Sequence, residues 1–199
     1  MMQNKIIIGI TGNSGSGKTT VSNLLAKKGA FVIDADKIAH EAMAAGSRIF
    51  EHIVNAFGKD VVSENGEIDR KKLGKIVFGD IEKRKALEAI VHPFVCKDII
   101  TKAQKATEKL VVMDVVLLIE SGLSEHCDSV WLVTAQKETM LNRIIDRDKL
   151  SNEAAAARMR NQRDITKLSV DVIIKNEGDV SALEKIVYKE LDNLVAGVK

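Results

Sequence analysis

A glycine-rich octapeptide near the start of the chain restricts the possible folds more than any other feature. It reads G-N-S-G-S-G-K-T over residues 12–19, matches the pattern G-x-x-x-x-G-K-[ST], and follows a short apolar run. Glycines let successive backbone N–H groups converge on phosphate oxygens, where side chains would block the approach. A helix starting at the octapeptide adds unsatisfied donors and the positive end of its dipole. The pattern predicts a phosphate-binding loop between a strand and a helix.

Two side chains of this loop carry chemistry of their own. In such loops the lysine bridges the β- and γ-phosphates of a nucleotide and the hydroxyl after it is a ligand of Mg²⁺, which predicts these roles for Lys18 and Thr19. The alternative, a turn that happens to carry a lysine, does not explain the flanking strand and helix signals. The residues expected to contact nucleotide are Gly12, Ser14, Gly15, Ser16, Gly17, Lys18, Thr19 and Thr20.

Five short apolar runs are rich in Val and Ile and show little polar alternation, which is typical of buried parallel strands with helices on both faces. They span residues 5–10, 30–35, 109–118, 129–134 and 171–175. Helical segments alternate with them, so the sequence predicts a doubly wound α/β fold with a five-stranded parallel sheet. We expect the strand order 2-3-1-4-5, with Lys18 at the centre.

The predicted helices follow from caps and breakers. Residues 17–28 form a helix that ends at Gly29, a residue suited to the left-handed position after a helix. Asp69 and Asp80 are expected to cap helices that run to residues 78 and 91. His92-Pro93 should break the second of these. Further helices are expected over residues 37–56 and 94–108, and a C-terminal helix should begin at a capping box formed by residues 181–184.

Composition excludes several classes of protein. The 199 residues are 45% hydrophobic and 29% charged, which suits one compact domain with an inserted or mobile subregion. The net charge is +2 with both signs interspersed, so no nucleic-acid surface is predicted. Cys96 and Cys127 fit neither a disulfide framework nor a metal knuckle. The first apolar run is too short for a signal peptide or a membrane span, and we expect a cytoplasmic protein.

Two acids end the second predicted strand, in the sequence Ile33-Asp34-Ala35-Asp36. Ligands of open α/β sheets lie beyond the carboxyl ends of the strands. An acid there can accept or orient the proton of an attacking hydroxyl, as a kinase requires. The alternative is a helix cap, a role that suits one of the two and leaves the other free for catalysis. By contrast, residues 133–138 read V-T-A-Q-K-E rather than the N-K-x-D of a guanine-nucleotide switch.

Arginines gather between the fourth and fifth predicted strands, at positions 143, 147, 158, 160 and 163. Phosphoryl transfer requires cations on the equatorial oxygens and the exclusion of water, and a mobile arginine-bearing lid supplies both. The alternative is an exposed helix whose arginines pair with nearby acids. It suits a single arginine better than it suits the whole cluster.

A further acid lies in or after the third apolar run. Residues 110–114 have the form of a strand that ends in a Mg²⁺-linked aspartate, Asp114. Because more apolar residues follow, we expect the strand to continue to about residue 118. Glu120 is then the better candidate to face the cleft.

Taken together, the chain resembles the dephospho-coenzyme A kinase family nearly from end to end. The resemblance lies in the loop at residues 8–20, the D-A-D element at 34–36, F-G at 57–58, H-P at 92–93, L-L-x-E-S-G-L at 117–123, Arg147-Asp148, Gln162 and the segment 171–178. The loop alone is generic, whereas the D-A-D, H-P and L-L-x-E-S-G-L elements together are far more specific.

The resemblance implies ATP-dependent phosphorylation of the ribose 3′-hydroxyl of dephospho-coenzyme A, with Mg²⁺, as the final step of coenzyme A biosynthesis. It implies Asp36 as the base, Lys18 and Arg147 as catalytic cations, and Asn176 and Gly178 in a loop beneath the adenine of ATP. His40, His92 and Glu120 would lie on the acceptor side. Residues 37–108 would form a helical substrate subdomain and residues 144–166 a lid, within a single domain of residues 1–199.

Two other functions stay open. One is another small-molecule kinase with the same loop, acting on a nucleoside, a nucleotide or shikimate. The other is a nucleotide-binding switch with negligible turnover, which would leave the D-A-D element unexplained.

Overall fold

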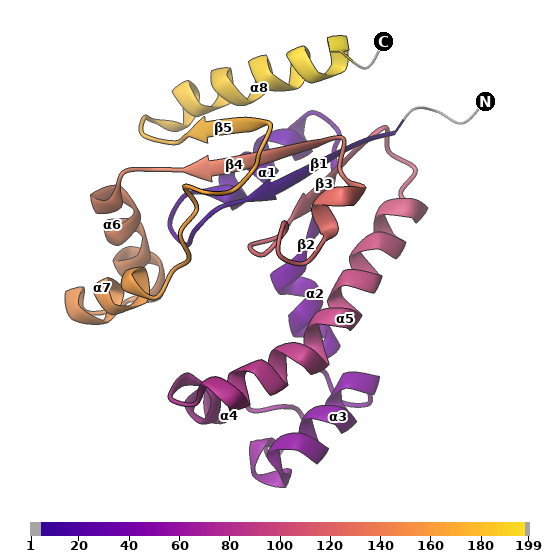
Figure 1. Ribbon diagram of the computed structural model, residues 1–199, viewed down its shortest axis with the longest axis vertical. Helices are drawn as coiled ribbons and strands as arrows, with labels where there is room; N and C mark the ends of the chain where they lie inside the picture. Colours follow the sequence, from indigo (N-terminus) through magenta and orange to yellow (C-terminus); the bar gives the residue numbers. More distant parts are fainter. Residues whose placement is uncertain (1–4, 198–199) are drawn as a thin grey trace. The chain divides into compact units, whose positions relative to one another are not determined.

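Five strands form one sheet in the computed structural model, which describes residues 5–197 apart from the side chain of Arg48. The strands are β1 (Ile6–Thr11), β2 (Phe31–Asp34), β3 (Leu110–Asp114), β4 (Ser129–Thr134) and β5 (Val172–Lys175). Their order is β2-β3-β1-β4-β5, and β1 pairs in parallel with both β3 and β4 (Figure 1). The predicted α/β fold and strand order are confirmed.

The chain divides into two compact units. The first comprises residues 1–33 and 105–199 and contains β1 and β3 to β5. Its helices are α1 (Lys18–Lys27), α6 (Lys137–Asp148), α7 (Asn152–Arg160) and α8 (Val180–Gly197), with the 3₁₀ helix η2 (Leu123–His126). The second unit, residues 34–104, contains α2 (Ala35–Ala42), α3 (Arg48–Phe57), η1 (Lys59–Val61), α4 (Arg70–Phe78) and all but the last residue of α5 (Ile81–Lys105).

The core of the first unit lies between the sheet and two helices. The α1 and α8 side chains that face it repeat at helical spacing, and they pack against Ile8, Ile10 and Trp131. From α1 come Val21, Leu24 and Leu25, and from α8 come Leu183, Val187 and Leu191. Each fully buried side chain of this size contributes about 1.5–3 kcal/mol. This burial anchors β1 and α1, the two elements that hold the phosphate loop.

The second unit has a core of its own, made of Ile49, Ile53, Val61, Ile68 and Leu73 with Ala42. As predicted, Asp69 and Asp80 cap α4 and α5. Each carboxylate accepts hydrogen bonds from two backbone N–H groups, all at 3.0 Å.

The single helix predicted over residues 37–56 is wrong, because the structure has α2 and α3 in its place. Gly46 lies between them with φ +78°. The Ser47 hydroxyl then accepts a hydrogen bond from the Phe50 N–H at 3.0 Å and begins α3. Apolar residues continue at helical spacing across this turn, which is why one helix was predicted. A serine directly before a helical segment, however, is itself a signal for a helix start.

The predicted break at His92-Pro93 is also wrong. Pro93 lies inside α5, which runs without interruption from Ile81 to Lys105. Proline removes one helical hydrogen bond and crowds the preceding turn, an effect that can bend a helix without ending it. Figure 1 shows α5 changing direction along its length.

Two other element ends differ from expectation. β3 ends at Asp114, and the apolar residues after it form turns rather than strand. α8 begins at Val180, with the Ala182 N–H donating to the Asp179 carboxylate at 2.8 Å, so Asp179 takes the capping place predicted for Ser181.

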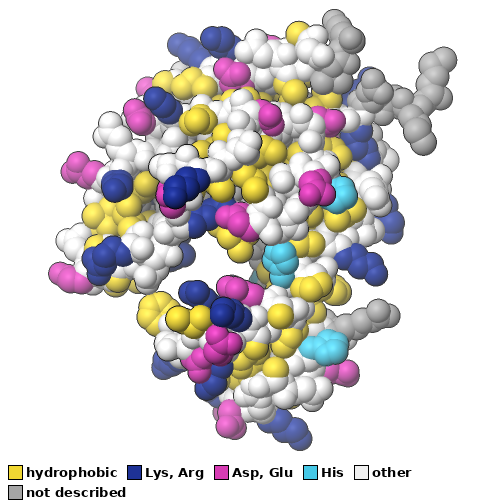
Figure 2. Space-filling view, viewed as in Figure 1, with side chains coloured by type: hydrophobic (Ala, Val, Ile, Leu, Met, Phe, Trp, Pro, Cys, Tyr) yellow, Lys and Arg dark blue, Asp and Glu magenta, His cyan; other side chains and the backbone are white. Residues whose placement is uncertain are grey.

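The surface carries both signs of charge. On the face seen in Figure 2, Lys and Arg side chains alternate with Asp and Glu. Among the described residues, none of the helices combines the length and apolar composition that a membrane span requires.

Candidate active site

The phosphate loop joins β1 to α1, and glycine is required at several of its positions. Gly12, Gly15 and Gly17 have φ of 148°, 82° and 96°, in a region that other residues rarely adopt. A Cβ on Gly12 would lie 2.2 Å from the carbonyl oxygen of Val133, and one on Gly17 would lie 2.0 Å from Nδ2 of Asn176. The loop is therefore packed tightly against β4 and against the residue that follows β5.

Lys18 begins α1 and places its charge over this loop. Its ammonium donates to the carbonyl oxygen of Gly12 at 3.0 Å. Thr19 is exposed, and Ser14 and Thr20 are half-buried. The first N–H groups of a helix have no acceptor within it, so the loop combines backbone donors, a helix dipole and a mobile cation. This arrangement can hold a chain of phosphates.

Asp114 lies at the end of a strand after all, because β3 stops there. It is level with Ile10 in the neighbouring strand β1. The Ser22 hydroxyl of α1 lies 2.9 Å from Oδ2 of Asp114 and 3.1 Å from the carbonyl oxygen of Lys18. The expected continuation of the strand to about residue 118 is therefore wrong, and Asp114 contacts the helix of the phosphate loop.

Arg143 on α6 was predicted only as one of the clustered lid arginines, and in the structure it links three segments. Its guanidinium donates to the carbonyl oxygens of Gly15 and Ser16, both at 3.3 Å, and to Asn176 at 3.4 Å (backbone O) and 3.3 Å (Oδ1). Asn176 in turn donates to the Ser16 carbonyl at 2.8 Å. The available signal was the position of Arg143 one helical turn before Arg147. Arg143 and Asn176 together hold the loop in place, and we call this pair the Arg143–Asn176 clasp.

Arg147, predicted to be catalytic, is held beside the loop. It donates to the Ser14 hydroxyl at 3.1 Å and to both carboxylate oxygens of Asp148 at 2.8 Å. Arg158 of α7 donates to the same carboxylate at 2.6 Å. The hydrogen bond from Arg147 is the largest cause of the lowered pKa of Asp148, and the charges of both arginines add to it. One carboxylate thus holds two of the predicted lid arginines.

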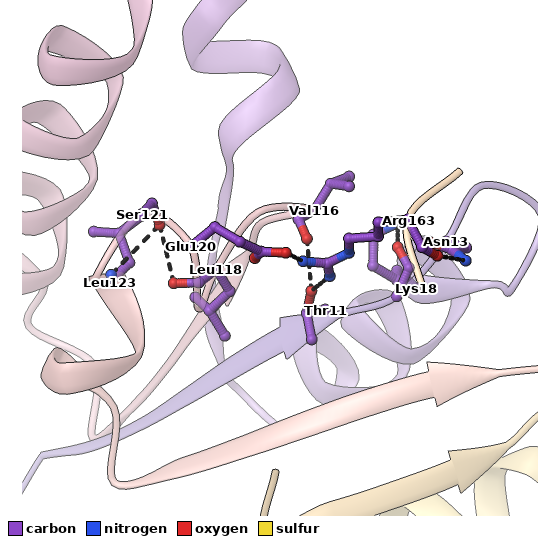
Figure 3. A network of polar contacts seen from close by, with 10 residues as sticks. Thr11, Asn13, Lys18, Val116, Leu118, Glu120, Ser121, Leu123 and Arg163 are labelled. Carbon is purple, nitrogen blue, oxygen red and sulfur yellow. Dashed lines mark hydrogen bonds and ion pairs between the residues drawn. The ribbon is translucent and has the colours of Figure 1, made fainter. Parts of the chain in front are cut away.

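Arg163 follows α7 and lies against the loop from another side (Figure 3). Its guanidinium forms an ion pair with Glu120 and donates to the Thr11 hydroxyl at 2.6 Å. Its carbonyl oxygen accepts from the Asn13 side chain at 3.1 Å, and Thr11 donates to the Val116 carbonyl at 2.7 Å. Burial raises the pKa of Glu120, but the hydrogen bond and charge of Arg163 outweigh it, so the net pKa lies below the ordinary value.

The two aspartates after β2 have different local roles. Asp34 is the N-cap of α2, and its Oδ1 accepts from the N–H groups of Asp36 and Lys37 at 2.9 and 3.1 Å. Asp36 is exposed in the first turn of the helix. The sequence left open which aspartate is the cap, and the geometry assigns that role to Asp34.

The other predicted residues have local contacts of their own. His40 and Arg70 meet at 2.8 Å within the second unit, and both ring nitrogens of His92 lie 3.8 Å from Sγ of Cys96. Gly178 lies in the turn between β5 and α8, where a Cβ would be 3.1 Å from that of Ala182. Asp36, His40 and His92 belong to the second unit, whereas Glu120 and the phosphate loop belong to the first.

Sequence relatives agree on one family. The family model described as dephospho-CoA kinase matches residues 6–182. A dephospho-CoA kinase from Fusobacterium nucleatum is 42% identical over 188 residues, covering 92% of this chain and 96% of the relative. One from Bacillus licheniformis is 41% identical over 192 residues, covering 94% and 96%.

Solved structures agree with the sequence relatives. TT1252 from Thermus thermophilus superimposes with a TM-score of 0.80 at 35% identity, covering 96% of this chain and 98% of that one. Dephospho-CoA kinase from Campylobacter jejuni gives a TM-score of 0.64 at 32% identity, covering 96% and 97%. A shikimate kinase from Acinetobacter baumannii, at 16% identity and a TM-score of 0.55, shares the fold alone. The chain therefore belongs to the dephospho-CoA kinase family.

Proposed function

We propose that the protein transfers the γ-phosphoryl group of ATP to the ribose 3′-hydroxyl of dephospho-coenzyme A, giving coenzyme A and ADP as the final step of coenzyme A biosynthesis. The observation that carries this proposal is the glycine-shaped loop with the Lys18 ammonium over it, in a chain of this family. The protein works on a small molecule in the cytoplasm, without nucleic acid or membrane.

The donor side uses the loop and the residues around it. The backbone donors from Gly12 to Thr20 surround the phosphates, and Lys18 leaves the Gly12 carbonyl to neutralise the transferring group. Mg²⁺ binds hard oxygen ligands and usually retains waters and substrate phosphates. The exposed Thr19 hydroxyl and the Asp114 carboxylate at the end of β3 fit such an ion, which would withdraw charge from the β- and γ-phosphates.

The acceptor side uses Asp36. Because Asp34 satisfies the start of α2, the Asp36 carboxylate is not needed as the cap. It can therefore accept or orient the proton of the attacking hydroxyl. A loose transition state keeps that proton on the acceptor until late, so orientation is the larger part of its contribution. His40, His92 and Glu120 would bind the acceptor, with residues 37–108 as the substrate subdomain.

The arginine-bearing segment, residues 144–166, acts as the lid. Arg147 already lies 3.1 Å from the loop residue Ser14 while Asp148 holds it. A triphosphate offers a stronger anionic partner than one carboxylate, so Arg147 exchanges Asp148 for phosphate oxygens as the lid closes. Asn176 and Gly178 form the floor beneath the adenine, consistent with the link of Asn176 to the Ser16 carbonyl.

A coupled kinase assay tests the proposal. Dephospho-coenzyme A should be phosphorylated at the expense of ATP and Mg²⁺, whereas nucleosides, nucleoside monophosphates and shikimate should stay inert. Preferential phosphorylation of one of those alternatives would refute the assignment. ATP hydrolysis without any acceptor dependence would favour a nucleotide-binding switch instead.

A further inference from the structure

The buried polar atoms that lack a hydrogen-bond partner belong to a residue of the phosphate loop and to two consecutive residues that follow α7. Within residues 5–197, the only buried side-chain nitrogens and oxygens without a partner are Ser16 Oγ, both amide atoms of Gln162, and Arg163 Nε. A buried polar atom left unpaired weakens the folded state. The missing partners of such atoms are supplied by ordered water or by the polar groups of a bound ligand.

Two segments carry these atoms, and they meet at Asn13. The Asn13 carbonyl oxygen accepts from the Ser16 N–H at 3.2 Å, and the Asn13 side chain donates to the Arg163 carbonyl at 3.1 Å. Arg163 is therefore held against the phosphate loop, and Gln162 is the residue that precedes it after the end of α7.

The neighbourhood lies on one flank of the loop. Arg163 contacts Glu120, which follows β3, and Thr11, which ends β1. β3 lies between β1 and β2 in the sheet, whereas the Arg143–Asn176 clasp lies toward β5. The strand that leads to Asp36 is β2, so the Arg163 side chain lies on the β2 flank of the loop, and Gln162 is the residue before it in the chain.

We propose that the side-chain amide of Gln162 binds the sugar hydroxyls of the acceptor, an inference that rests on the proposed function. An amide presents two donors and an acceptor. Phosphate oxygens can satisfy the donors only, whereas an alcohol satisfies both kinds of group. The ribose of the acceptor carries a 2′-hydroxyl next to the reacting 3′-hydroxyl. Arg163 Nε and the Ser16 hydroxyl then donate to the phosphoryl group in transit.

The test is Gln162→Met, which keeps the length of the side chain and removes its donors and its acceptor. The KM for dephospho-coenzyme A should rise about tenfold, the effect of one lost hydrogen bond in a buried site. The KM for ATP should stay within about twofold. The melting temperature of the ligand-free protein should stay the same or rise, because an unsatisfied buried group is removed.

A matched control and a binding measurement make the outcome decisive. Gln136→Met makes the same substitution at an exposed glutamine outside the lid and should alter none of these quantities. Dephospho-coenzyme A added without ATP should raise the melting temperature of the wild type and of Gln136→Met, but much less that of Gln162→Met.

Four results would overturn the inference. A lower melting temperature in Gln162→Met with an unchanged KM would make Gln162 a packing residue. A rise in the KM for ATP alone would place it on the donor side. If the wild type neither binds nor phosphorylates dephospho-coenzyme A, the proposed function fails as well. An active wild type with an unaffected variant rejects only the role of Gln162.

Discussion

Replacing Gly17 with alanine should destabilise the first unit by about 3 kcal/mol, of which only a part is backbone strain. The left-handed conformation costs a residue with a Cβ roughly 1–2 kcal/mol. The stiffer unfolded chain offsets about 0.4–1 kcal/mol of this. The added Cβ would lie 2.0 Å from Nδ2 of Asn176, which is 5% exposed and therefore has little room to move. Displacing this amide breaks its 2.8 Å bond to the Ser16 carbonyl and leaves a buried group unsatisfied, at about 1–3 kcal/mol.

Gly29→Ala separates the two effects. Gly29 has φ +88°, similar to the 96° of Gly17, but its Cβ would have no atom within 4 Å. Gly29→Ala should therefore lower the free energy of unfolding by only about 1 kcal/mol, which is the backbone strain less the gain from the stiffer unfolded chain. Urea unfolding followed by fluorescence measures both variants, because Trp131 is the single tryptophan and is fully buried in the same unit. In an Asn176→Ala background, Gly17→Ala and Gly29→Ala should lower the free energy of unfolding by about the same amount, because the side chain that the Gly17 Cβ would meet is gone. Equal costs in the wild-type background would refute the close approach of Gly17 to Asn176.

Other predictions follow from the same site. Lys18→Ala should abolish phosphoryl transfer and weaken ATP binding, whereas near-normal turnover would place the chemistry elsewhere. Asp36→Asn should lower kcat by a factor of roughly 10²–10⁴ without changing stability. Asp34→Ala should lower the stability measured by thermal unfolding by about 1 kcal/mol, because the helix cap is lost. The opposite pattern would mean that the two aspartates have each other's roles. The pKa of Glu120 in the folded protein lies below its ordinary value of 4.5. The ion pair with Arg163 therefore contributes its full stabilisation above that pH, and the contribution is lost as the pH falls through the lowered pKa. Acid unfolding of Glu120→Gln should therefore depend less on pH below about 4.5 than that of the wild type, and identical curves would contradict the pairing.

The elements that hold the phosphate loop could be predicted from the sequence because their signals are local. A glycine pattern between a strand and a helix is contiguous, and its chemistry fixes the backbone around it. The apolar run after β3 was different. Val115 and Leu118 are buried, at 7% and 0% exposure, although neither belongs to the strand. Apolar character reports burial and not hydrogen bonding, so the end of β3 at Asp114 was missed.

The contacts that brace the site could not be predicted for a related reason. Arg143 donates to backbone carbonyls, which every residue has, so no partner side chain marks its role in the sequence. Arg163 reaches Thr11 across more than 150 positions, a separation that only the sheet order resolves. The choice between Asp34 and Asp36 depends on one backbone conformation, φ −94° and ψ 112° at Asp34, which suits an N-cap.

The interruption of the first unit by the second has a consequence for synthesis on the ribosome. Residue 6 pairs with residue 110, so β1 leaves the ribosome long before its neighbour β3 exists. Residues 34–104 are continuous and already contain their own core, and domains generally fold as units while the chain emerges. The nascent phosphate loop, by contrast, has to wait for β4 and for Asn176, which are made only after residues 34–104. The loop is thus made before the second unit but reaches its working shape after it, and during that interval its glycines keep the unpaired strand end free to rearrange.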